Sequence, residues 1–154
     1  DMMAWQWTRM ILREETLKLF NGGDIKRDWT YIDDIVSGLL AALDRGFDWE
    51  IINLGCGQPV SNIEFVHTLE KLLGKKAAIE DAPTPASEPM ITFADISKAR
   101  RLLAYEPKVS VEEGLSRFIE WARQARVIQL VDPFRLRSSN ELRPILAHLL
   151  RNTS

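Results

Sequence analysis

Short extended runs alternate with helical patterns along this chain, but only one run, 51–54, is apolar enough to form a buried strand. Strands that alternate with helices are typical of α/β proteins, whose sheets need several strands between their helices. The helical patterns fall at about 4–16, 32–45, 62–73, 95–103, 110–126 and 141–151. We therefore expect an α/β fold that is mostly helical and has few strands.

Turn residues predict how the extended runs are connected. The runs 17–20 and 27–31 flank Asn21-Gly22-Gly23-Asp24, which favours a short hairpin. A further strand is predicted at 76–80. The next segment, 82–89, contains three prolines and is predicted to be a surface loop.

Helical spacing and capping residues define two of the helices. The helix predicted at 32–45 places six apolar residues on one stripe, and Gly46 follows it as a helix-ending glycine. These residues are Ile32, Ile35, Val36, Leu39, Leu40 and Leu43. Ser61 and Glu64 have the spacing of a capping box, which predicts that the helix at 62–73 begins there.

The composition excludes several classes of function. The net charge of −2 gives no reason to expect nucleic acid or an anionic membrane as partner, and no apolar run approaches the length of a membrane span. Cys56 is the only cysteine, so no disulfide can form within the chain, and we expect a cytoplasmic protein. His67 and His148 lack metal-ligand spacing, so we expect no metal site.

A glycine pair follows the run 51–54 in Gly55-Cys56-Gly57. A strand-to-helix turn of this kind can hold a phosphate with its backbone N–H groups, and the pattern is similar to the cofactor loop of S-adenosylmethionine methyltransferases. Asn53 stands where those enzymes have an acid, and Pro59 where they have a third glycine. We therefore interpret the segment as a tight turn and keep a methyltransferase fragment as a remote alternative.

The segment 26–36 carries a more specific pattern. It reads Lys26-Arg27-Asp28-Trp29-Thr30-Tyr31-Ile32-Asp33-Asp34-Ile35-Val36. It resembles the Arg-Asp-aromatic-x-(Tyr/His)-(Ile/Val)-x-Asp-(Ile/Val) segment of extended short-chain dehydrogenases/reductases, most closely the nucleotide-sugar epimerases of the UDP-glucuronate 4-epimerase type. The segments 1–4, 52–60 and 92–114 resemble further motifs of that family in the same order, so the resemblance covers about residues 1–125.

The resemblance implies the carboxyl-terminal, substrate-binding portion of that fold, without the main Rossmann half. Enzymes of the family bind NAD on a glycine-rich loop and use a Tyr-x-x-x-Lys pair. Neither pattern occurs in this sequence, so we expect no catalytic and no cofactor-binding residue here. We divide the chain into a nucleotide-sugar-binding domain at 1–126 and a tail at 127–154, which matches nothing in the family and has a predicted helix.

Four residues match substrate-binding positions of the family. Phe20 would stack on the nucleotide base, with a core aromatic as the alternative. Arg27 would hold the diphosphate with its planar fork, with a surface ion pair to Asp24 or Asp28 as the alternative. Thr92 would line the sugar pocket. Glu88 keeps an acidic position of the family, with a solvated loop carboxylate as the alternative.

Two departures weaken the match. Pro85 stands where the family commonly has Arg or Gln, which removes a second polar or cationic contact. Ala104 stands where the family has a helix-ending glycine. If the backbone there has a positive φ, alanine costs on the order of 1 kcal/mol.

These observations support two main functions. The chain is either the UDP-sugar-binding portion of a nucleotide-sugar epimerase, not catalytic in isolation, or a non-enzymatic stand-alone module for binding or assembly. Any binding of UDP-sugar is expected to be weak. Removal of the Rossmann half would uncover an apolar face, so we expect that half or a second copy of the chain as partner, with the tail in the homodimer interface. The sequence leaves open the sugar, its stereochemistry and the origin of the truncation.

Overall fold

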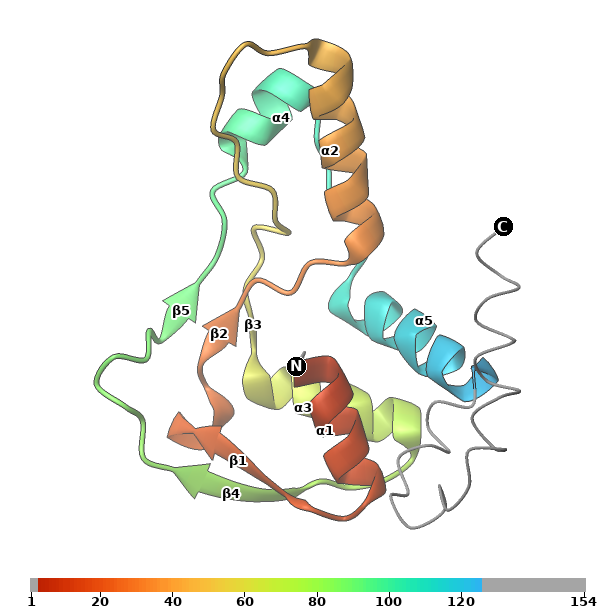
Figure 1. The fold of residues 1–154 in the computed structure, drawn as a ribbon. Helices are drawn as coiled ribbons and strands as arrows, with labels where there is room; N and C mark the ends of the chain where they lie inside the picture. Colours follow the sequence, from red (N-terminus) through yellow and green to blue (C-terminus); the bar gives the residue numbers. More distant parts are fainter. Residues whose placement is uncertain (1–2, 126–154) are drawn as a thin grey trace, which may run out of the picture.

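The computed structural model describes residues 3–125 and confirms a mostly helical α/β fold (Figure 1). Its helices are α1 (Met3–Leu12), α2 (Ile32–Arg45), α3 (Asn62–Leu73), α4 (Ser97–Leu103) and α5 (Val111–Gln124), with a short 3-10 turn η1 (Asn21–Gly23). Its strands are β1 (Thr16–Phe20), β2 (Lys26–Arg27), β3 (Val60–Ser61), β4 (Ala78–Ala82) and β5 (Ile91–Thr92). The helix predicted at 141–151 and the tail at 127–154 lie outside the described residues.

The strands form two small sheets, so the predicted hairpin between 17–20 and 27–31 is wrong. β1 pairs in parallel with β4, whereas β2 lies between an antiparallel β3 and a parallel β5. The turn η1 separates β1 from β2 because the Gly22 N–H donates to Asp81 Oδ1 at 2.7 Å and so binds the turn to β4. Gly23 is also confined, since a Cβ there would lie 2.8 Å from Ile63 Cβ.

The buried strand predicted at 51–54 is also absent from the described structure. This segment has no regular secondary structure and pairs with no described strand, and the Ile51 side chain is 65% exposed. A strand needs a neighbour for its backbone N–H and C=O groups. None of the described strands pairs with it, so an apolar run alone did not suffice for a strand.

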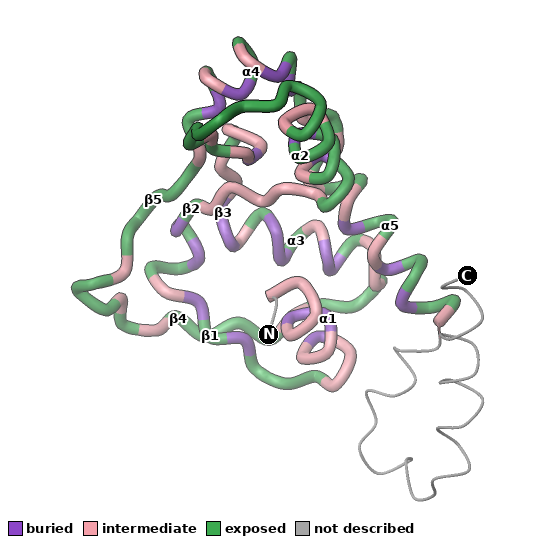
Figure 2. The backbone as a smooth tube through the Cα atoms, turned by 45° about the horizontal axis from the view of Figure 1, so that its top comes forward, coloured by how far each residue is buried: buried purple, intermediate pink, exposed green. Residues whose placement is uncertain are grey.

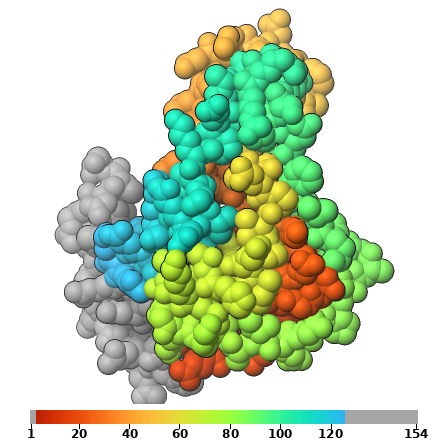
Figure 3. All heavy atoms as spheres, turned by 180° about the vertical axis from the view of Figure 1, so that it is seen from behind, coloured from red at the N-terminus to blue at the C-terminus, as the bar shows by residue number. Residues whose placement is uncertain are grey.

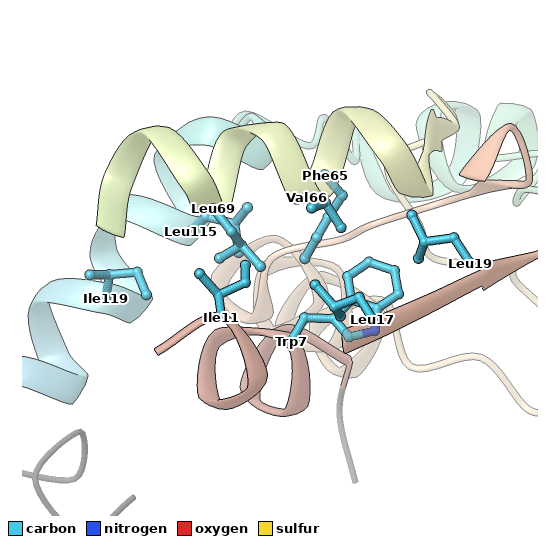
Figure 4. Close-up of a cluster of buried hydrophobic side chains, with 9 residues drawn as sticks. All are labelled: Trp7, Ile11, Leu17, Leu19, Phe65, Val66, Leu69, Leu115 and Ile119. Atoms are coloured by element: carbon cyan, nitrogen blue, oxygen red, sulfur yellow. The ribbon is translucent and has the colours of Figure 1, made fainter. Parts of the chain in front are cut away.

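The main core lies between α1, α3, α5 and the inner face of β1 (Figure 4). On α3, the buried face is formed by Phe65, Val66 and Leu69, which are at most 2% exposed. The Phe65 ring lies 4.1 Å from the Trp29 ring, centroid to centroid, and 5.6 Å from Trp7. This packing joins the segment after β2 to the core.

A second, smaller core joins α2 and α4 in a lobe that projects beyond the main body (Figures 1 and 3). Here α2 is in contact through small residues, because a Cβ at Gly38 would lie 2.7 Å from a methyl carbon of Leu54. Because the side of α2 that carries Gly38 packs against Leu54, the apolar stripe of the helix faces outward. The Leu43 side chain is 76% exposed, and Figure 2 shows α2 and the segment after it mostly in the exposed colour.

The helix ends confirm two predictions made from sequence. Ser61 and Glu64 form the predicted capping box at the start of α3. Ala104 ends α4 in the left-handed conformation, with φ of 51°, and its N–H donates to Arg100 O at 3.1 Å. The alanine therefore occupies a position that favours glycine.

Candidate functional site

The three-stranded sheet places Arg27 beside Thr92. Arg27 ends β2, and its register partners are Thr92 on β5 and Val60 on β3. The Lys26 N–H donates to Met90 O at 2.9 Å and adds a bond between the β2 and β5 segments. Two residues that are 65 positions apart in the sequence are thus fixed as neighbours by backbone pairing.

Both residues line a hollow of about 700 Å³, which is the size of a small-molecule site. Its walls come from the start of α1, the segment after β2, the segment 52–55 and the segment around β5. The lining residues are Met3, Arg27, Asp28, Trp29, Thr30, Ile52, Asn53, Leu54, Gly55, Thr92, Phe93 and Ala94. Sequence reasoning missed Asn53 and Phe93, although Phe93 directly follows a residue that it identified.

The Arg27 guanidinium is held by three partners. Its Nη1 donates to Lys26 O at 2.7 Å and to Pro89 O at 3.0 Å, and its Nη2 forms an ion pair with Glu88. The ion pair is largely shielded, since the side chains of Arg27 and Glu88 are 18% and 32% exposed. The alternative of an ion pair with Asp24 or Asp28 is therefore wrong, and Glu88 is not a free loop carboxylate.

Asp28 holds two walls of the hollow together. Its carboxylate accepts N–H groups from Cys56 at 3.0 Å, from Gly57 at 3.0 Å and from Ala94 at 2.9 Å. Gly55 approaches so closely that a Cβ there would lie 2.6 Å from Asp28 Oδ2. Asp28 thus orders the surrounding loops.

These bonds also decide what the glycine pair of the loop can do. The N–H groups of Cys56 and Gly57 are both taken by Asp28, and the Cys56 N–H is shared with Thr30 Oγ1 at 2.9 Å. The loop leads into β3, not directly into a helix. It does not fit a phosphate or a dinucleotide in this conformation, and no observation favours the methyltransferase alternative.

Two buried polar side chains, Tyr105 and Asp34, hold further loop segments in place. The Tyr105 hydroxyl donates to Gly55 O at 3.0 Å, and Asp34 accepts the N–H groups of Lys108 and Val109 at 2.9 and 3.1 Å. Burial raises the pKa of the Tyr105 phenol, and the nearby Asp34 charge adds to the effect. The phenol therefore stays protonated and acts as a hydrogen-bond donor.

Phe20, the fourth predicted residue, lies apart from this arrangement. It ends β1 opposite Ala82 of β4 and is not among the residues that line the hollow. The structure thus brings Arg27, Glu88 and Thr92 together and leaves Phe20 on the other sheet. Among residues 3–125, no group of three His, Cys, Asp or Glu side chains could hold a metal ion. No helix in this range is long and apolar enough to cross a membrane.

Comparison with known proteins gives consistent results. The model of the NAD dependent epimerase/dehydratase family matches residues 1–55. The UDP-glucuronate 4-epimerase of Thermodesulfobacterium geofontis is 42% identical over 125 residues, which cover 80% of this chain and 38% of that protein.

Solved structures agree in fold. The UDP-glucuronic acid 4-epimerase of Bacillus cereus in complex with UDP-glucuronic acid and NAD has a TM-score of 0.73 at 36% identity. The UDP-glucose 4-epimerase of Thermotoga maritima with UDP-glucose has a TM-score of 0.72 at 30% identity. Each match covers 80% of this chain and 40% of the solved one, so the chain spans about two fifths of the length of these relatives.

Proposed function

Because this chain is related to the NAD-dependent epimerases/dehydratases of the extended short-chain dehydrogenase/reductase type, we propose that it forms the nucleotide-sugar-binding portion of such an enzyme. The observation that carries the proposal is the pairing of Arg27 with Thr92 at a hollow of about 700 Å³. An arginine fork matches two phosphate oxygens at once, and a hydroxyl can bond to a sugar. The complexes of two relatives contain UDP-glucuronic acid and UDP-glucose, so we propose a UDP-sugar as ligand.

In this proposal, Arg27 contacts the diphosphate and Thr92 the sugar. Phe20 lies outside the hollow, so it can stack on the base only if the ligand extends from the hollow toward the end of β1. Glu88 acts through Arg27, with which it forms an ion pair.

We propose further that this chain binds without catalysing. The family's chemistry needs NAD and a Tyr-x-x-x-Lys pair, and this sequence contains neither the glycine-rich cofactor loop nor that pair. The one glycine pair in a candidate phosphate loop has its N–H groups bonded to Asp28. The isolated chain should therefore neither bind NAD at micromolar concentrations nor epimerise a UDP-sugar.

NMR titration with UDP-glucuronic acid and with UDP-glucose tests the binding role. We expect saturable shifts for residues of the hollow with an affinity on the order of millimolar, because only one cationic side chain of the described residues lines it. Arg27→Ala should abolish most of the binding. Arg45→Ala is the matched control, since it removes the same charge at the exposed end of α2 and should change nothing. An unchanged titration for Arg27→Ala would show that the arginine does not bind the ligand.

The outward stripe of α2 favours a second function, that of an assembly module. Ile32, Leu39 and Leu43 are all more than half exposed, and Trp49 after the helix is 80% exposed. Large contiguous apolar patches on a protein surface mark interaction sites. We propose that this face packs against the remainder of a complete enzyme or, in its absence, against a second copy of the chain.

A further inference from the structure

Arg27 already holds an anion in the ligand-free structure. Three of its five N–H donors are used, two by backbone carbonyl groups and one by the Glu88 carboxylate. An ion pair at one end of the guanidinium neutralises most of its attraction for a second anion. The residue best suited to hold a diphosphate is therefore partly occupied in the free protein.

No other charge in the hollow compensates for this loss. Among residues 3–125, Arg27 and Asp28 are the only ionisable residues that line it, and Asp28 is negative. Pro85, in the loop before β5, stands where a second cationic or polar side chain would be expected from the resemblance. With Glu88 in place, a diphosphate in the hollow would meet an arginine already paired with a carboxylate, and the negative charge of Asp28, which backbone N–H groups hold in position.

From these contacts we propose that Glu88 is an internal competitor, which occupies Arg27 in the free protein and has to be displaced by an anionic ligand. The inference rests on the proposed nucleotide-sugar site and adds its regulation. Glu88 is carried by a turn in which its own N–H donates to Pro85 O at 2.9 Å. The loop from Pro83 to Pro89 is thus the element that brings the competing carboxylate to the arginine.

A different role for Glu88 would be to orient Arg27 for the ligand. The structure argues against this role because Nη1 is already fixed by Lys26 O and Pro89 O, at 2.7 and 3.0 Å. These two carbonyl groups belong to the backbone and stay in place when the Glu88 side chain is changed. Orientation therefore does not depend on the carboxylate, whereas the charge of the site does.

Three variants of the full chain separate charge from orientation. Glu88→Gln keeps an oxygen that can accept from Arg27 but removes the negative charge, and Glu88→Ala removes both. Glu80→Gln is the matched control, because Glu80 lies on β4 and pairs with Lys18 at the surface. Each variant is titrated by calorimetry or NMR with inorganic pyrophosphate, with UDP and with uridine.

We expect both Glu88 variants to bind pyrophosphate and UDP about three- to tenfold more tightly than the unchanged chain, which corresponds to removal of a partly shielded ion pair. Uridine, which carries no phosphate, should bind equally to all variants. Glu80→Gln should match the unchanged chain. Equal or weaker pyrophosphate binding by Glu88→Gln would overturn the inference.

Other outcomes separate this inference from the proposed function. If UDP binding weakens in both Glu88 variants while pyrophosphate binding does not change, Glu88 contacts the nucleoside and is not a competitor. If pyrophosphate binding tightens but UDP and UDP-sugars bind no better than pyrophosphate, the competitor exists and the nucleotide-sugar function fails. If no anion binds to any variant, both proposals fall together.

Discussion

Replacement of Ala104 by glycine should stabilise this protein. Ala104 ends α4 with φ of 51°, a region in which the Cβ of an L-residue lies too close to the following carbonyl oxygen. The side chain is exposed, so its removal loses no buried contact. The only other effect of the substitution is the greater freedom of glycine in the unfolded chain.

The two effects oppose each other and have known sizes. The left-handed conformation costs a non-glycine residue about 1–2 kcal/mol, whereas glycine loses about 0.5–1 kcal/mol more conformational entropy on folding. The balance favours glycine by about 0.5–1 kcal/mol. In a protein of this size, that gain raises Tm by about 1–4 °C.

Urea denaturation followed by circular dichroism measures the effect as a higher midpoint with an unchanged slope. Two controls fix its origin. Gly74 ends α3 with φ of 68°, and a Cβ there would meet no other atom within 4 Å. Gly74→Ala should therefore destabilise through backbone strain alone, by about 1 kcal/mol. Ala125 ends α5 with φ of −70°, so Ala125→Gly should give no gain. Equal stabilisation by Ala104→Gly and Ala125→Gly would refute the argument from backbone strain.

Two further predictions concern pH and association. Burial disfavours the charge of Glu70, but hydrogen bonds from the Ala77 N–H, the His67 ring and the Lys76 ammonium outweigh it and hold the pKa at about 2, below the ordinary 4.5. The resulting stabilisation, on the order of 3 kcal/mol, is therefore present above pH 4.5 and is lost as pH falls toward 2. Glu70→Gln should abolish this part of the pH dependence in acid titration of unfolding. The double substitution Leu39→Lys and Leu43→Lys should reduce self-association, measured by light scattering. It should not lower stability, since both side chains are exposed. If the unchanged chain is already a monodisperse monomer, the assembly role is contradicted.

The helices could be predicted from the sequence because their signals are local. Ser61 with Glu64 marked the start of α3, and Gly46 marked the end of α2. The sheets could not be predicted, because strand pairing joins distant segments: β1 pairs with β4, and β2 with β5. The turn at Asn21–Gly23 carries hairpin residues, yet its bond to Asp81, 59 positions away, decides where the chain goes.

In the candidate site, too, the sequence identified residues but not the partners that they contact in the fold. Arg27 and Thr92 were found by resemblance, and the structure makes them neighbours. Asp24 and Asp28, which are close in sequence, were the alternative partners considered for Arg27, but its carboxylate partner is Glu88, 61 positions away. Charged residues of a site can be identified from the sequence, but which of them form ion pairs depends on the fold.

That distinction determines what Arg27 can bind. A free arginine at the edge of a hollow attracts a diphosphate, whereas an arginine that is paired with a carboxylate attracts it only by exchange. The exchange needs only a rotation of the Glu88 side chain away from Arg27, because the carbonyl groups of Lys26 and Pro89 that fix the guanidinium belong to the backbone. Asp28 differs because backbone N–H groups from two separate segments hold its charge, so a ligand that displaced it would also open the walls of the hollow. Of the two carboxylates near Arg27, only Glu88 can therefore yield to a ligand and leave the site intact.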